Sequence, residues 1–228
     1  MSNEAALLKE LVILVDDEDN SIGSASKLAA HTWDPKNQTS PLHRAFSVFI
    51  FDANGQLVLQ QRSKEKLTFA GLWTNSVCSH PLASIPDESC SDKKLGVKNA
   101  AIRRIQYELG VPNNFFSVND FRIVGRIHYK SQSFPSSHQG KDGQDQIKGI
   151  LLAEHEIDYI LFVQAHKDIP FHLNDDEEIT PWYGLIARSL LGNFWDELLD
   201  PTKKSAFWDQ EIEDGYQLPP IKKMNGSE

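Results

Sequence analysis

The chain has 228 residues, of which 40% are hydrophobic and 24% are charged, as is usual for a globular protein. The formal net charge of −9 argues against a non-specific nucleic-acid binder, since attraction to phosphates needs a basic surface. Two cysteines are too few for a secreted disulfide framework, and no apolar run approaches the ~18 residues of a membrane helix. We therefore expect a cytoplasmic protein, a monomer or weak oligomer, with neither nucleic-acid nor membrane partners.

The first half of the chain predicts mainly strands. Residues 11–15 form a short apolar run that ends in an acidic turn, and residues 44–51 give the strongest strand pattern, apolar on both faces. Asn54-Gly55 predicts a tight primed turn, because this pair accepts the positive φ angles that such a turn needs. Residues 56–62 then return as the partner strand.

The second half adds helices. Residues 98–109 have helical spacing, with Gly110 as the C-terminal stop, and residues 121–129 and 154–163 predict two further strands. A last helix is predicted from residue 180 to 195, with Pro181 at its first position. Strands, one helix, more strands and a terminal helix indicate an α+β fold rather than an alternating βαβ series.

Cys78-Ser79-His80-Pro81 is the first candidate for chemistry. The residue before a proline favours an extended backbone, so Cys78 and His80 are expected to project to the same side. An isolated pair of this kind is also compatible with a structural cysteine beside a surface histidine.

A possible metal site comes from three histidines and two strand carboxylates. Three imidazoles and carboxylates suit a borderline or hard divalent ion, and carboxylates in so apolar a strand need a metal or a partner if they are buried. Solvated histidines and an exposed acidic strand face remain the alternative. The residues concerned are His31, His43, His80, Glu154 and Glu156.

Basic residues could bind a phosphate or diphosphate if they converge. These are Lys27, Arg62 and Lys66, with Arg44 as a possible fourth. Residues 103–111 look like a degraded Nudix box, in which Arg104 and Tyr107 stand where the pattern has glutamates. A hydrolase of that family needs several carboxylates to hold its metals, and Glu108 alone is a poor set for hydrolysis.

Taken together, the motifs resemble those of type I isopentenyl diphosphate isomerase, a Nudix-fold enzyme that does not hydrolyse. The resemblance runs from about residue 11 to residue 195 and rests on four stretches: Leu42-His43-Arg44-Ala45-Phe46-Ser47-Val48-Phe49, Gly71-Leu72-Trp73-Thr74-Asn75-Ser76-Val77-Cys78-Ser79-His80-Pro81, Glu154-His155-Glu156-Ile157-Asp158-Tyr159 and Thr180-Pro181-Trp182. It implies a mixed β-sheet sandwiched by helices, as one isomerase domain over residues 1–200 with a C-terminal tail over residues 201–228.

The resemblance also implies roles for particular residues. The catalytic residues would be Cys78, Glu156, Tyr129 and Trp182. Substrate-binding residues would be Lys27, Arg62, Lys66 and Ser79. His31, His43, His80, Glu154 and Glu156 would hold Zn²⁺, Mn²⁺ or Mg²⁺, and Glu108 would hold a Mg²⁺ bound to the diphosphate of a small-molecule substrate.

Two departures from the family pattern affect the expectation. The loop over residues 133–152 is longer than the family's, which costs little. Between Asp176 and Thr180 only three residues stand where the family has a further strand and helix. The alternatives are a Nudix diphosphohydrolase and a catalytically inactive, truncated relative.

Overall fold

Two long strands rich in β-branched and aromatic residues lie side by side at the centre of the molecule. The computed structural model describes residues 8–61, 73–132, 151–172, 181–183 and 221–224, the last two ranges by their backbone only. Strand β3 (His43–Phe51) runs parallel to β8 (Ala153–Gln164), in a register that begins at His43 and Glu156. Two residues distant in sequence are thereby placed next to each other.

The other strands of this sheet extend from that pair. On the β8 side lie β7 (Arg122–Gln132), antiparallel to β8, and β10 (Ile221–Met224), parallel to β7. On the β3 side, β1 (Leu11–Val15) and β6 (Val77–Ser79) pair with different parts of β3, and β2 (Ser21–Ser26) pairs with β1. Short helix α2 (Lys27–His31) follows β2 directly.

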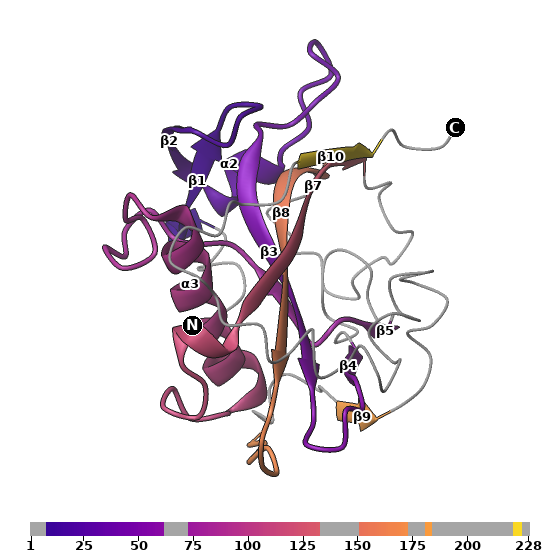
Figure 1. Ribbon diagram of the computed structural model, residues 1–228. Helices are drawn as coiled ribbons and strands as arrows, with labels where there is room; N and C mark the ends of the chain where they lie inside the picture. Colours follow the sequence, from indigo (N-terminus) through magenta and orange to yellow (C-terminus); the bar gives the residue numbers. More distant parts are fainter. Residues whose placement is uncertain (1–7, 62–72, 133–150, 173–180, 184–220, 225–228) are drawn as a thin grey trace.

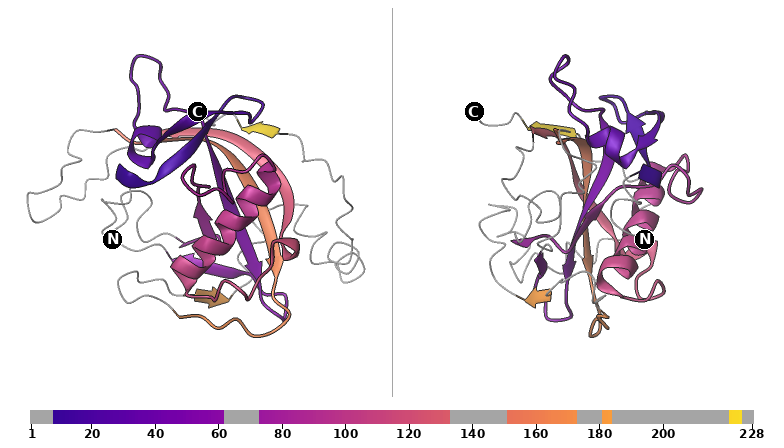
Figure 2. Two further views of the ribbon diagram at one scale, coloured as in Figure 1. Left: turned by 90° about the vertical axis from the view of Figure 1, so that its left-hand side faces the viewer. Right: turned by 180° about the vertical axis from the view of Figure 1, so that it is seen from behind.

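The two faces of the sheet have different coverings (Figures 1 and 2). Helix α3 (Lys93–Leu109) packs on one face, where the large hydrophobic cluster includes Phe46 and Tyr159. The 3-10 turn η1 (Val118–Asp120) follows α3. The other face lies towards a three-stranded sheet of β5 (Trp73–Thr74), β4 (Val58–Gln61) and β9 (Pro181–Tyr183), and carries a smaller cluster around Phe162.

This arrangement confirms the predicted α+β fold with a mixed sheet. The predicted helix over residues 180–195 is wrong at its start, because Pro181–Tyr183 pairs as a strand with β4. The rest of that helix lies outside the described residues. The tail after residue 200 contributes β10 to the sheet edge, and the boundary at residue 200 stays a prediction.

Three local expectations need correction. Helix α3 begins at Lys93, five residues before the predicted start, because the side chain of Asp92 accepts hydrogen bonds from the backbone N–H groups of Lys94 and Leu95. The turn after β3 is not of the primed type: Gly55 has a φ of 77° and Asn54 does not have a positive φ. Strand β4 pairs with β5 and β9, and the residue before it, Leu57, forms a single bridge with Phe51 of β3.

No helix among the described residues is long and apolar enough to span a membrane.

Candidate metal centre

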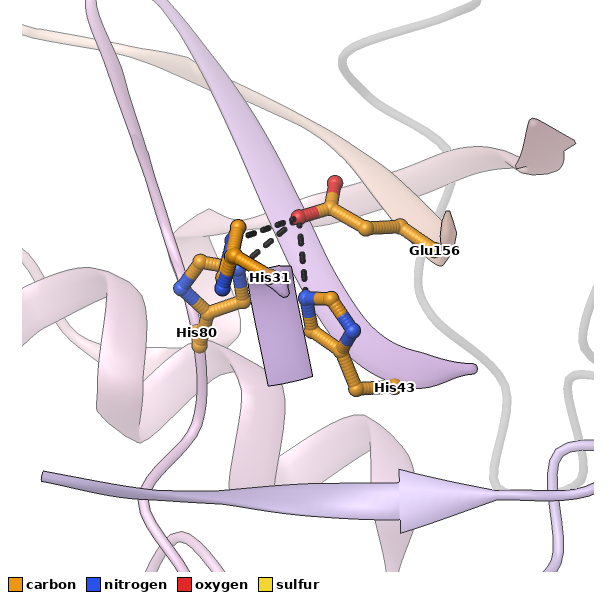
Figure 3. A group of neighbouring side chains, drawn as sticks. All are labelled: His31, His43, His80 and Glu156. Atoms are coloured by element: carbon orange, nitrogen blue, oxygen red, sulfur yellow. Dashed lines mark hydrogen bonds and ion pairs between the residues drawn. The ribbon is translucent and has the colours of Figure 1, made fainter. Parts of the chain in front are cut away.

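Four side chains from four separate segments meet at one end of the central sheet (Figure 3). They are His31 at the end of α2, His43 at the start of β3, His80 just after β6, and Glu156 in β8. Their ligand atoms all lie within 4.8 Å of one another. The Oε1 atom of Glu156 is 2.8 Å from His80 Nε2, 3.3 Å from His43 Nε2 and 3.8 Å from His31 Nε2. The structure thus brings together four of the five residues predicted as metal ligands, and Glu154 is not part of this group.

The secondary structure explains why they meet. Glu156 and His43 are direct neighbours in the parallel β8–β3 register. Ser26 caps α2 through its side chain, which accepts a hydrogen bond from Ala29 N, and this short helix delivers His31 from its last turn.

The hydrogen-bonding pattern of the imidazoles leaves room for a cation. His31 Nδ1 lies 2.7 Å from the carbonyl of Lys27, and His43 Nδ1 lies 2.9 Å from that of Pro41. A carbonyl only accepts, so both Nδ1 atoms carry a proton, and in the neutral form of each ring the Nε2 atom has a lone pair. The buried Nε2 of His43 accordingly has no hydrogen bond. Such a donor set, with Nδ1 anchored on the backbone, fits a divalent metal ion.

The charge states of the cluster agree with this. Burial would raise the pKa of Glu156, but the adjacent imidazoles of His43 and His80 hold it well below its usual range, so the carboxylate is ionised. Burial lowers the pKa of His80 well below its usual value and keeps this ring neutral, as a ligand must be. For His31, burial lowers the pKa, but Glu154 and Glu156 raise it by more, so the net shift is upwards. Glu154 Oε2 lies 3.1 Å from His31 Nε2.

Glu156 has a second partner that a metal would not replace. Tyr129 stands opposite Glu156 in the β7–β8 ladder and donates a hydrogen bond of 2.6 Å to Oε2. Burial, followed by the charge of Glu156, raises the pKa of Tyr129, so the phenol keeps its proton and remains a donor. One oxygen of Glu156 therefore faces the histidines and the other faces a neutral hydroxyl group.

Cys78 lies on the same sheet face as Glu156. It stands opposite Ser47 in the β6–β3 pair, and opposite residues project to one face. Ser47 Oγ donates a hydrogen bond of 2.9 Å to Asp158 Oδ2, and Asp158 shares a face of β8 with Glu156. Cys78 is half-buried and forms no disulfide.

Of the expected diphosphate-binding residues, Lys27 opens the helix α2 that ends at His31. Half-buried Lys27 has its pKa lowered by burial and then by the charge of Arg104, while Glu108 and Cys78 act in the opposite direction. Arg62 and Lys66 lie outside the described residues. Ser79 stands opposite Phe46, so its side chain projects to the α3 face, away from Cys78.

The remaining predicted residues occupy other places. Glu108 is not part of the four-residue cluster: it binds Arg104 and accepts a 3.3 Å hydrogen bond from Gln60. Trp182 pairs with Leu59 through its backbone. The prediction that Arg44 binds phosphate is wrong, because its guanidinium group is buried against Asp19. Arg44 Nε lies 2.7 Å from Asp19 Oδ1.

Sequence reasoning missed several residues that support the site. The sequence motifs assign no role to Asp158 or to Ser47, which donates a hydrogen bond to it. Glu88 and Arg103, which hold the segment carrying His80, were also missed. These residues come together only in the tertiary structure. The only sign of them in the sequence is Arg103, the first residue of the degraded box.

Known proteins define the class to which this fold and site belong. Residues 41–194 match the family model of the NUDIX domain. An isopentenyl-diphosphate delta-isomerase of Gibberella zeae is 39% identical and covers 84% of this chain and 78% of its own. The enzymes of that name from Candida albicans (37% identical, 90% and 79% covered) and Mus musculus (36%, 86% and 88%) are similarly related. The chain therefore belongs to the Nudix family, and within it to the isopentenyl-diphosphate delta-isomerases.

Proposed function

We propose that the chain interconverts isopentenyl and dimethylallyl diphosphate by adding a proton at one carbon and removing one at another. The observation that carries this proposal is the arrangement of Glu156, which faces three histidines with one oxygen and shares a sheet face with Cys78. Two acid/base groups beside one bound five-carbon unit are what a double-bond shift requires. The names of the related enzymes support the same activity.

His31, His43, His80, Glu154 and Glu156 would hold a divalent ion, which is Zn²⁺, Mn²⁺ or Mg²⁺. When bound, the ion supplies positive charge that fixes Glu156 and sets its basicity. Glu108 would hold a Mg²⁺ that neutralises the diphosphate of the substrate. Glu108 lies in the last turn of α3, and its carboxylate would have to release Arg104 to bind this ion.

Cys78 and Glu156 would exchange protons with the substrate carbons, and Tyr129 would hold the Glu156 carboxylate in place through its hydrogen bond. A tertiary carbocation forms at the midpoint of such a reaction. The ring of Trp182 would stabilise it through its π face.

Lys27, Arg62 and Lys66 would bind the diphosphate. Ser79 would contribute through its main chain, because its side chain projects to the other face of the sheet. The cytoplasmic location and the oligomeric state stay predictions from the sequence.

Diphosphate hydrolysis is a weaker candidate. The α3 helix offers Glu108 as the one carboxylate in the end of the degraded box, and this side chain is paired with Arg104. Hydrolytic Nudix enzymes gather several carboxylates around their metals.

The test is exchange of hydrogen isotope between isopentenyl diphosphate and D₂O in the presence of Mg²⁺, followed by NMR. Wild type should incorporate deuterium, and Cys78→Ser or Glu156→Gln should reduce the rate about 10²–10⁴-fold. Cys90→Ser is the matched control, since Cys90 lies in the segment before α3 with its thiol directed at backbone carbonyls, and it should keep the wild-type rate.

Absence of exchange in a wild-type protein that still binds metal and substrate would favour the inactive relative. Release of phosphate or pyrophosphate from a nucleoside diphosphate compound would favour the hydrolase.

A further inference from the structure

Two histidines outside the candidate metal centre lie together on the opposite face of the central sheet. His155 alternates with Glu154 and Glu156 along β8 and therefore projects away from the cluster. His128, from the neighbouring strand β7, projects to the same side. Their Nε2 atoms are 3.0 Å apart and their rings are stacked with an interplanar angle of 23°.

The tautomer of His155 is fixed by the loop that precedes β3. Its Nδ1 lies 2.7 Å from the carbonyl of Ser40 and 2.9 Å from the hydroxyl of Thr39, and that hydroxyl itself donates to the same carbonyl. Nδ1 must therefore carry the proton, which leaves a lone pair on Nε2. Anchoring of this kind is how proteins orient histidines that bind metals.

We propose that His128 and His155 form a second metal site, which takes a transition-metal ion such as Ni²⁺ or Cu²⁺ and is independent of the candidate catalytic centre. Two nitrogens 3.0 Å apart, each about 2.1 Å from one ion, subtend an angle of about 90°. That is the cis angle of octahedral and tetragonal coordination, which Ni²⁺ and Cu²⁺ favour; a tetrahedral ion needs nitrogens about 3.4 Å apart.

The surroundings select against Mg²⁺. The site offers imidazoles, whereas Mg²⁺ prefers oxygen ligands. Lys130, which stands opposite His155 in the ladder, is the nearby cation that would repel a metal ion. Its ammonium group is engaged with the ring of Trp33, 5.6 Å from the ring centroid. Both histidines are half-buried, and water molecules would be the remaining ligands of the ion.

Binding displaces the proton that the two rings share. Without an ion, the hydrogen bond between the rings needs one proton, which His128 Nε2 donates because His155 Nε2 can only accept. The ion takes the place of this proton, and His128 then either carries its proton on Nδ1 or, if cationic, releases one to solvent. No oxidation or bond cleavage is involved.

Isothermal titration of the full chain with Ni²⁺ tests the proposal. Wild type should bind two equivalents, and His128→Ala and His155→Ala should each bind one. His166→Ala, which removes an exposed histidine elsewhere, should still bind two. Wild type that binds a single equivalent, or a His128→Ala variant that retains both, would overturn the proposal.

A second variant avoids any change in β7 or β8. In His31→Ala/His80→Ala, which removes two ligands of the candidate catalytic centre, one equivalent of Ni²⁺ should remain. Cu²⁺ added to this variant should give an electron paramagnetic resonance spectrum with two nitrogen ligands. A variant that binds no ion contradicts the second site, whatever happens to the first.

Discussion

Glu156 and Asp158 occupy neighbouring positions on one face of β8, yet their surroundings push their pKa values in opposite directions. The imidazoles beside Glu156 outweigh its burial and keep its pKa low. Asp158 is just as deeply buried, and burial together with the charge of Glu156 raises its pKa well above the usual value. One of its oxygens accepts from Ser47, and the other is buried without a partner. The two carboxyl groups of the strand therefore differ in acidity, and Asp158 is the weaker acid of the two.

Asp158→Asn should therefore change how stability depends on pH. For wild-type Asp158 the folded state keeps a proton that the unfolded chain loses above about pH 4, so its contribution to stability is full below that pH. It is lost as pH rises towards the raised folded pKa, at up to about 1.4 kcal/mol per pH unit. The asparagine variant lacks this loss.

The measurement is urea unfolding of both proteins between pH 5 and pH 9, with a chelator present so that no ion compensates Glu156. The stability of the variant relative to wild type should increase with pH. Parallel pH profiles would show that Asp158 is ionised in the folded protein.

Helix α3 and the segment before it form a clamp on the backbone that carries His80. Glu88 is 3% exposed and accepts two hydrogen bonds from the guanidinium group of Arg103 and one of 2.8 Å from Leu82 N. The same arginine donates to the carbonyl of His80 at 3.3 Å. Arg103 and Glu88 together therefore hold the chain on both sides of Pro81.

Glu88→Gln should weaken both the fold and the metal centre. Loss of a buried charge-assisted pair costs about 1.5–3 kcal/mol of unfolding free energy, and a misplaced His80 should lower the affinity for Zn²⁺ about 10–100-fold. Arg103→Lys should show the same pattern, because lysine cannot bridge the two partners. Asp87→Asn, at the exposed neighbouring position, is the control; equal metal affinity in all four proteins would refute the clamp.

The elements that sequence patterns predicted are the ones with long, regular patterns. The strands β3 and β8 and the end of α3 at Gly110 needed only local signals, because apolar runs and a left-handed glycine cap are written in adjacent residues. The start of α3 was missed because its first turn is polar. Pro181 suits both a helix start and an edge strand, and its pairing with Gln60 decided between them.

The residues of the candidate site also divide into those that local sequence motifs predict and those that they do not. The histidines and glutamates of the metal centre could be named from their motifs. Their supporting partners could not, because Glu88–Arg103 and His128–His155 are contacts between segments whose sequences carry no mark of each other.

One buried aspartate contacts four elements of the described fold. Asp19, in the turn between β1 and β2, has a φ of 64° and is fully buried. It binds Arg44 of β3 and Tyr159 of β8, and lies 3.4 Å from Arg126 of β7 and 3.9 Å from Lys93 of α3. A single carboxylate therefore balances cations from three elements.

Asp19→Asn should be among the most destabilising substitutions outside the hydrophobic core. It leaves buried Arg44 without its counter-charge, which costs about 3–5 kcal/mol of unfolding free energy. Glu18→Gln, at the exposed neighbour, should change it by less than about 0.5 kcal/mol. Urea unfolding of the three proteins measures both effects, and a loss below about 1 kcal/mol for Asp19→Asn would mean that the arginines are satisfied without it.

The candidate metal centre of His31, His43, His80 and Glu156 joins points spread over most of the described chain, and it does so in a molecule whose two cysteines form no disulfide. An ion bound there acts as a reversible cross-link: it closes three long loops at one point and so restricts the unfolded chain, as a disulfide does. Because the ligands assemble only when β3 and β8 are in register, the free energy of binding adds to that of folding. A chelator should therefore act as a mild denaturant of this protein as well as an inhibitor.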